Sequence, residues 1–189
     1  MRIIAGRGRG TQLFAPKGMD TRPTQDKVKE SLFNMIQFDV PQARVLDLFA
    51  GSGALALESL SRGAESAVLV DKSREALDCI RRNIQKLRMD DETTVLACDW
   101  TQALVKCQIQ GLQFDLVFLD PPYRMTELAE ISNKLLEMNL LAQDALLVIE
   151  HRTDTQPQMN DCFSLERERT YGDTQIHFYR LNMEEAHEI

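Results

Sequence analysis

The feature that most constrains the fold is a regular alternation of strand-like and helical segments between residues 44 and 149. Strand-like runs are expected at Arg44–Phe49, Ala67–Val70, Thr93–Ala97, Leu116–Leu119 and Ala145–Ile149. Helical patterns separate them, near Gly53–Arg62, Arg74–Arg88, Thr101–Gln108 and Glu127–Met138, with Ser73 as a cap of the second. Strands that alternate with helices join through right-handed crossovers into a parallel sheet covered on both faces. The sequence therefore predicts an α/β fold.

The two ends of the chain follow a different pattern. Cys162–Thr170 and Thr174–Leu181 flank Tyr171-Gly172-Asp173, which is typical of an antiparallel hairpin. At the beginning, short strands are expected around Arg2–Ala5 and Gln12–Phe14, followed by a helix from about Gln25 to Gln37 that Thr24 can cap. We expect an N-terminal hairpin and helix at 1–40, a Rossmann-like domain at 41–183 and a frayed tail at 184–189.

Composition narrows the class of protein. The 189 residues are 43% hydrophobic and 27% charged, which is usual for a globular protein, and no apolar run suggests a membrane span or a secretory leader. The four cysteines and three histidines share no ligand spacing. We therefore expect a cytoplasmic protein with reduced cysteines and no structural metal.

Charge is distributed unevenly along the chain. The net charge is −7, but residues 1–30 carry seven basic and three acidic residues, a local charge of +4. A basic arm on an acidic body suits contact with the phosphates of a nucleic acid. The candidates for such contacts are Arg2, Arg7, Arg9, Lys17 and Arg22. The alternative is a solvated N-terminal strand pair with scattered charge.

A glycine-rich turn follows the first predicted strand of the alternating region, in the segment Asp47-Leu48-Phe49-Ala50-Gly51-Ser52-Gly53. Glycine allows a tight backbone turn and the close approach of a ligand. The spacing Gly51-x-Gly53-x-x-Ala56 also matches a permissive dinucleotide fingerprint. The turn alone leaves three possibilities open: a nicotinamide dinucleotide, a nucleoside-bearing methyl donor, or neither.

Three acids at strand ends favour the methyl donor. Asp47 would crowd a pyrophosphate but suits the cationic methionine end of S-adenosylmethionine, through water or backbone amides. Asp71 can accept hydrogen bonds from both ribose hydroxyls, and Asp99 can accept one from the adenine amine, with Trp100 as a wall for the adenine. In open α/β folds, ligands bind at this carboxyl edge of the sheet. Strand-end aspartates also cap helices, and for Asp99 that alternative is equally plausible.

The fourth strand of the alternation ends in Asp120-Pro121-Pro122-Tyr123. Two prolines fix the backbone and remove two N–H donors, so the turn presents acceptors: the Asp120 carboxylate and the Pro121 carbonyl. Two acceptors can bind the hydrogens of an exocyclic amine and turn its lone pair toward a methyl sulfonium. Asp120 can then take the departing proton, and Tyr123 can stack on the flat base. The motif fits planar amino substrates without choosing among adenine, guanine and glutamine amide.

These residues resemble the bacterial RsmD family of 16S ribosomal RNA guanine-N2 methyltransferases. The likeness spans nearly the whole chain and includes Met1–Gly6, Arg22-Pro23-Thr24, Val45–Leu55, Ser61–Ala64, Phe114–Tyr123 and Tyr171–Thr174. Asp71 departs from the glutamate frequent in the family, and the segment from Arg7 to Thr11 is less basic than is usual there. The Arg22-Pro23-Thr24 element is the more selective marker of the family.

The resemblance implies a class I S-adenosylmethionine-dependent methyltransferase with a mostly parallel seven-stranded sheet and a terminal antiparallel hairpin. It implies methylation of a guanine N2 in 16S rRNA, within a 30S subunit or its assembly intermediate. It also implies that Thr24 borders the methionine end of the cofactor and that Phe49 belongs to the cofactor site with the glycine turn. The other readings are adenine-N6 methylation of DNA or RNA, a non-catalytic RNA-binding module, and an oxidoreductase using a nicotinamide cofactor.

Overall fold

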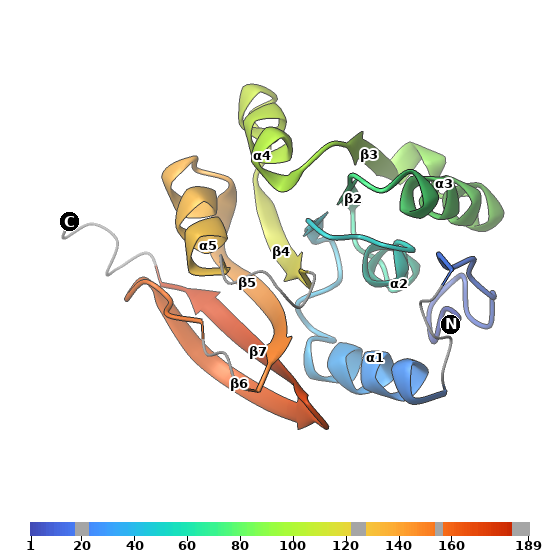
Figure 1. The fold of residues 1–189 in the computed structure, drawn as a ribbon, viewed down its shortest axis with the longest axis horizontal. Helices are drawn as coiled ribbons and strands as arrows, with labels where there is room; N and C mark the ends of the chain where they lie inside the picture. The colour runs from blue at the N-terminus through green and yellow to red at the C-terminus, as the bar shows by residue number, and fades with distance from the viewer. Residues whose placement is uncertain (18–22, 122–127, 154–156, 183–189) are drawn as a thin grey trace.

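The protein folds around one seven-stranded sheet with the strand order β3-β2-β1-β4-β5-β7-β6 (Figure 1). The computed structural model describes residues 1–17, 23–121, 128–153 and 157–182, with only the backbone at 23–25. The strands are β1 (Arg44–Asp47), β2 (Ser66–Asp71), β3 (Thr93–Ala97), β4 (Phe114–Leu119), β5 (Leu141–Arg152), β6 (Phe163–Tyr171) and β7 (Thr174–Leu181). The first five are parallel where they pair, whereas β7 is antiparallel to both β5 and β6. The predicted α/β class and the terminal hairpin are confirmed.

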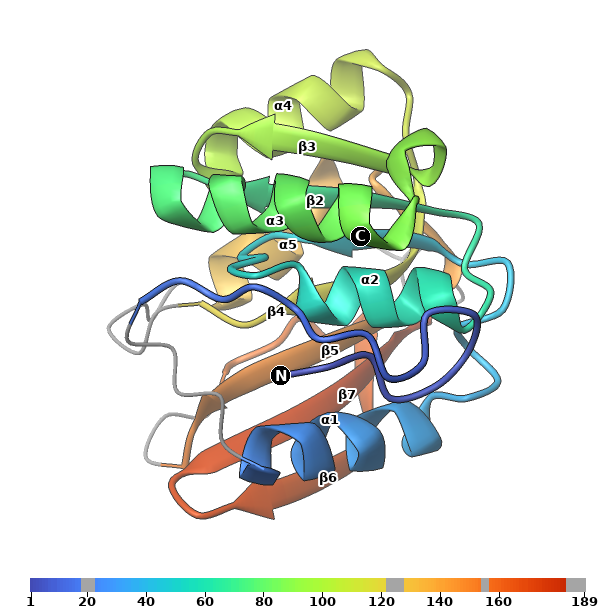
Figure 2. The same cartoon turned by 90° about the vertical axis from the view of Figure 1, so that its right-hand side faces the viewer.

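The helices cover both faces of this sheet. They are α1 (Pro23–Met35), α2 (Ala54–Ser61), α3 (Arg74–Leu87), α4 (Trp100–Ile109) and α5 (Leu128–Glu137), with a short 3-10 helix at Asp90–Glu92. Figure 2 shows α1, α2 and α3 in front of the sheet, with α4 and α5 on the far side. Ser73 caps α3, as expected, by accepting a hydrogen bond from the Ala76 N–H at 3.4 Å.

Alternation along the strands divides the interior into two cores. Val45, Phe118 and Val148 pack under α1, α2 and α3 in one cluster. Their neighbours Leu46, Val117 and Leu147 pack under α4 and α5 in the other. Because successive side chains in a strand point to opposite faces, each central strand is apolar on both sides. This explains the nearly continuous apolar runs that marked these strands in the sequence.

The N-terminal segment differs from its prediction. Residues 1–17 form a single antiparallel bridge, Arg2 with Gln12, and no extended pair of strands. The two predicted segments thus pair as expected, with the Ile3 N–H donating to the Thr11 carbonyl and the Leu13 N–H to the Met1 carbonyl, both at 3.0 Å, but they do not extend into the strands predicted at Arg2–Ala5 and Gln12–Phe14. The reason is that the N–H groups of Ile4 and Ala5 donate to the two carboxylate oxygens of Glu58, at 2.8 and 3.0 Å, so they do not join a strand ladder.

The prediction that Thr24 caps this helix is also wrong, because α1 begins at Pro23 and already includes Thr24. Pro23 is the first helical residue, which is a favoured place for a proline since its missing N–H needs no partner there. The remaining boundaries lie within four residues of the prediction, and those of β3 and β7 match it. The largest differences are in β5, which begins at Leu141, opposite Phe114 of β4, and extends to Arg152 because its last residues pair with β7.

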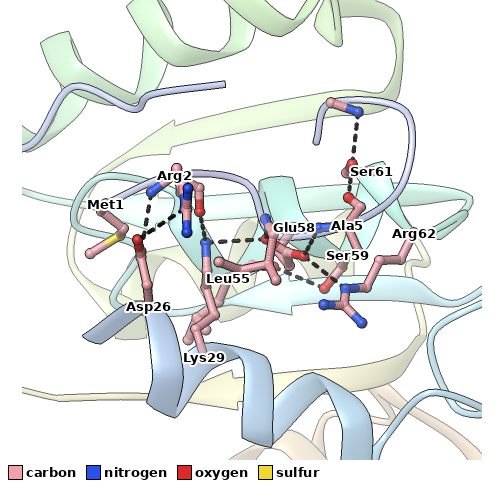
Figure 3. Close-up of polar contacts among 12 residues, drawn as sticks. Met1, Arg2, Ala5, Asp26, Lys29, Leu55, Glu58, Ser59, Ser61 and Arg62 are labelled. Carbon is pink, nitrogen blue, oxygen red and sulfur yellow. Dashed lines mark hydrogen bonds and ion pairs between the residues drawn. The ribbon is translucent and has the colours of Figure 1, made fainter. Parts of the chain in front are cut away.

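A buried ionic cluster fastens the N-terminal segment to the helices. The Glu58 side chain is fully buried and forms ion pairs with Lys29 at 3.1 Å and Arg62 at 2.8 Å. Figure 3 shows Glu58 on α2 between Lys29 of α1, Arg62 and the backbone at Ala5. Lys29 also donates to the Arg2 carbonyl. One carboxylate thus joins the N-terminal segment, α1 and α2.

The tight contact at Gly6 gives a prediction about stability. A Cβ at Gly6 would lie 1.7 Å from the Ser61 carbonyl oxygen, whereas a Cβ at Gly10 would meet nothing within 4 Å. Both glycines have a positive φ, 79° and 84°, so backbone strain is common to both positions. We expect Gly6→Ala to lower the free energy of unfolding by at least about 2 kcal/mol more than Gly10→Ala, in urea titrations. Equal losses would show that the segment is not seated against α2 as described.

Candidate active site

The carboxyl ends of β1, β4 and β5 border a cavity of about 620 Å³. It lies on the face of the sheet that α1 and α2 cover, and its acidic lining residues are Asp47, Asp120 and Glu150. Its wall also includes Phe49, and the β6–β7 turn contributes Tyr171 and Gly172. A cavity of this size, partly apolar with a few convergent charged groups, is the common form of a small-molecule site.

Ala50 and Ser52 of the glycine turn line this cavity. Gly51 and Gly53 both have a positive φ, 56° and 79°, and Gly53 directly precedes α2. A Cβ at Gly53 would lie 3.0 Å from a methyl carbon of Leu69, so glycine is needed here both for backbone conformation and for packing. The Ala50 N–H donates to the Val70 carbonyl at 2.9 Å, which holds the turn to the end of β2.

Asp47 is the most unusual acid of the site. Its side chain is 1% exposed, and its Oδ1 has no hydrogen-bond partner in the described part of the chain. Burial raises the pKa of Asp47 to about 7, against the opposing effect of the Ala56 and Phe49 backbone N–H groups, and the nearby charge of Asp71 adds to the rise. An unpaired buried carboxylate is costly, so this atom is suited to a cationic or N–H-bearing ligand.

Asp71 and Asp99 serve the local backbone. Asp71 accepts hydrogen bonds from the Gly51 N–H at 2.9 Å and the Ser73 N–H at 2.8 Å, and so ties the glycine turn to the start of α3. Asp99 caps α4 by accepting from the Gln102 N–H at 3.0 Å and from the Thr101 hydroxyl at 2.5 Å. These two hydrogen bonds lower the pKa of Asp99 despite partial desolvation. The capping alternative for Asp99 is therefore realised, and both ligand roles stay predictions.

Asp120 follows β4 directly and keeps an exposed surface at the cavity. Desolvation by the surrounding protein raises the pKa of Asp120 well above its usual range, and the carboxylates of Glu150 and Asp47 add to the rise. Pro121 is half-buried next to it, while Tyr123 lies outside the described residues.

Glu150 is a site residue that sequence reasoning missed. It is half-buried and lines the cavity with Asp47 and Asp120. Burial raises the pKa of the Glu150 carboxyl. The signal in the sequence was an acid directly after the apolar run Ala145–Ile149, in the position that Asp120 holds after β4.

The remaining predicted cofactor residues do not all lie at the cavity. Phe49 lines the cavity. Trp100 is the first residue of α4 and packs half-buried against the core of the opposite face. Thr24 belongs to α1, but its side chain is outside the described part.

The predicted RNA-contacting residues lie around the N-terminal segment. Arg2 is paired with Asp26 at 3.4 Å, and Arg7 is paired with Glu92. Arg2 and Arg9 border a second cavity of about 350 Å³, between this segment and α1. The Lys17 side chain is exposed near the start of α3, since its backbone N–H donates to Glu75 at 2.7 Å. Arg22 lies outside the described residues.

Comparison with known proteins assigns the family. The family described as Conserved hypothetical protein 95 matches residues 1–180. YlbH of Bacillus subtilis, provisionally named an rRNA methyltransferase, is 38% identical over 95% of this chain and 98% of its own length. The Ribosomal RNA small subunit methyltransferase D of Escherichia coli K12 is 36% identical over 98% of this chain and 91% of its own length.

This chain is a member of that family. A solved structure of the Escherichia coli protein yhhF, provisionally described as a methyltransferase, superimposes with a TM-score of 0.86 at 35% identity, covering 96% of this chain and 98% of that one. A Haemophilus influenzae protein described provisionally as a methylase gives a TM-score of 0.78 at 32% identity, with the same coverage. The family membership and the Rossmann-like methyltransferase fold predicted from the sequence are confirmed.

The described residues contain neither a membrane-spanning helix nor a metal-binding cluster. No helix there is long and apolar enough to cross a membrane. Within the same ranges, no group of three or more histidine, cysteine or acidic side chains is arranged to hold a metal ion.

The raised pKa of Asp47 gives a prediction about stability and pH. A buried carboxyl with a folded pKa of about 7 and an unfolded pKa near 3.8 favours folding while it is protonated. That contribution is lost as pH rises from the unfolded value through about 7. We expect Asp47→Asn to be more favourable to stability at about pH 8 than at about pH 5, by roughly 1–3 kcal/mol in urea unfolding of the ligand-free protein. A pH-independent difference between variant and parent would contradict the shift.

Proposed function

We propose that this protein uses S-adenosylmethionine to methylate the exocyclic N2 of a guanine in 16S ribosomal RNA. The observation that carries the proposal is one cavity lined by Asp47, whose buried Oδ1 has no hydrogen-bond partner among the described residues, and by Asp120, the first residue of the acceptor turn. The first group suits a cationic cofactor, and the second suits an amine. The relatives named for small-subunit ribosomal RNA support the choice of substrate.

The residues present fit the cofactor. Asp47 would hold the ammonium of its methionine part, since Oδ1 lacks a donor. Gly51 and Gly53 allow the tight backbone turn that brings Ala50 and Ser52 to the cavity wall. When bound, the cofactor supplies a methyl group on a positively charged sulfur. We further propose that Asp71 binds the ribose. Phe49, Asp99, Trp100 and Thr24 would contact the rest of the cofactor.

Asp120 and Pro121 would perform the work on the substrate. The carboxylate and the carbonyl accept the two hydrogens of the amine and so fix the direction of its lone pair. As the nitrogen gains the methyl group, it loses a proton, and the Asp120 carboxylate is placed to take it. The raised pKa of Asp120 makes it a stronger base than an ordinary aspartate. Tyr123 would stack on the flat base after the base leaves its own stack.

The basic N-terminal part would meet the RNA. We propose residues 1–40 as an RNA-facing extension of a methyltransferase domain at 41–183, with phosphate contacts from Arg2, Arg7, Arg9, Lys17 and Arg22. The side chains of Arg2 and Arg7 are 59% and 49% exposed, although each has an acidic neighbour. RNA inside a 30S subunit or an assembly intermediate is the proposed partner. Counterion release at such contacts makes binding weaker at high salt.

The decisive test is nucleoside mapping of small-subunit RNA from cells with and without the gene. We expect one N2-methylguanosine to be absent in the deletion strain and restored by the wild-type gene. Asp120→Ala should not restore it, with methyl transfer in vitro lowered at least about 100-fold, while calorimetry shows cofactor binding within about twofold of wild type. Loss of an N6-methyladenosine instead would establish adenine as the substrate base.

The assignment of Asp47 to the ammonium has a test of its own. Because the charged ligand binds the ionised carboxyl, affinity for S-adenosylmethionine should weaken by up to about tenfold for each pH unit below about pH 7. Asp47→Asn should bind weakly at every pH and lose this dependence. Calorimetry between about pH 5.5 and pH 8 measures both effects, and an unchanged pH profile in the variant would remove Asp47 from this role.

A further inference from the structure

Glu150 is an acid of the cavity that the proposed methyl transfer does not use. It stands near the end of β5, half-buried, with its carboxylate at the cavity wall. Within the ranges that the structure describes, no hydrogen bond or ion pair is formed by this carboxylate. A half-buried carboxylate at a cavity wall can accept hydrogen bonds from a ligand bound there.

The strand register places Glu150 beside Asp120. The segment in which β4 and β5 pair ends with Leu119 opposite Ile149. The next residues, Asp120 and Glu150, therefore lie side by side just beyond it. Phe118 and Val148 belong to the same core, and alternation puts Asp120 and Glu150 on that face too. In agreement with this placement, the charge of Glu150 is one cause of the raised pKa of Asp120.

Among the described residues, the cation that lines this cavity is already paired elsewhere. Lys29 lines the same cavity, but its ammonium donates to the Arg2 carbonyl and pairs with Glu58 at 3.1 Å. Two adjacent carboxylates, with Asp47 as a third in the cavity wall, repel one another. Such an arrangement is compensated when a ligand brings several N–H donors in a row.

We propose that Glu150 binds the N1–H of the target guanine, next to the amine held by Asp120, and thereby selects guanine over adenine. The inference rests on the proposed guanine-N2 activity and adds the residue that reads the base. Guanine presents N1–H and the N2 amine as two adjacent donors on its Watson–Crick edge, next to the O6 acceptor. Adenine presents an acceptor at N1, and a carboxylate facing that acceptor leaves two lone pairs opposed. The acceptor turn alone does not make this distinction.

A base analogue separates this role from a general role in folding. 2-Aminopurine keeps the 2-amino group but has a bare N1 acceptor in place of N1–H. We expect the wild-type enzyme to methylate RNA carrying guanine at the mapped position at least about 10-fold more efficiently, in kcat/KM, than RNA carrying 2-aminopurine there. Glu150→Gln offers an amide N–H to a bare N1, so its preference should fall to about 1 or reverse.

Two matched variants control the experiment. Glu137→Gln makes the same change at an exposed position near the end of α5 and should keep the wild-type preference. Glu150→Asp keeps the carboxylate and should favour guanine even if its overall rate is low. Because each result is a ratio of two substrates on one enzyme, partial loss of folded protein cancels.

The outcomes distinguish the inference from the activity on which it rests. If wild-type enzyme methylates guanine N2 and Glu150→Gln retains the full preference for guanine over 2-aminopurine, Glu150 does not read N1 and the inference is wrong. If wild-type enzyme methylates no guanine N2 in small-subunit RNA, the proposed function itself fails. A preference that collapses in Glu150→Gln alone supports both.

Discussion

The arrangement of the cavity wall depends on one buried carboxylate, that of Glu58. It accepts hydrogen bonds from the backbone at Ile4 and Ala5, and it pairs with the cations of Lys29 and Arg62. With four donors, the charge is fully compensated in a place from which water is excluded. Burial lowers the pKa of Lys29, and Glu58 opposes that effect. Removal of Glu58 would therefore leave the Lys29 ammonium buried without its ion-pair partner. The N-terminal segment, α1 and α2 are therefore held as one unit against the sheet.

The cavity itself shows the opposite electrostatic situation. Asp47, Asp120 and Glu150 come from β1, β4 and β5, which are neighbours in the sheet, and all three face the same side. Burial raises the pKa of each carboxyl, and the charges of Glu150 and Asp47 raise that of Asp120 further. A fold tolerates such a cluster at a cost in stability, and the cost is relieved when donor-rich ligands enter. The carboxylate of Glu58 is paired with cations and stabilises the fold. The three cavity carboxylates lack such compensation, which is typical of a binding site.

The sequence predicted the sheet and two of these three acids because their signals are local. Asp47 precedes a glycine turn and Asp120 precedes two prolines, so each strand end is marked in the sequence. Glu150 has no such mark, because β5 continues through it to Arg152 by pairing with β7, with Glu150 opposite Ile176. That pairing joins residues distant in the chain. The N-terminal strands were mispredicted for a similar reason, since the partner of the backbone at residues 4 and 5 is a side chain more than 50 residues away.

In the N-terminal segment, the backbone forms the contacts with α1 and α2, while basic side chains stay partly exposed. The Arg2 carbonyl accepts from buried Lys29, and the Arg7 N–H donates to the Ser61 carbonyl at 2.9 Å, so the backbone is fixed to α1 and α2. The guanidinium groups of both residues remain about half exposed. A basic surface that is rigid before binding loses less conformational entropy when it meets phosphate than a free arm would. Since Met1 of the same segment lines the cavity, an RNA held there would be positioned relative to Asp120 by the protein's own core.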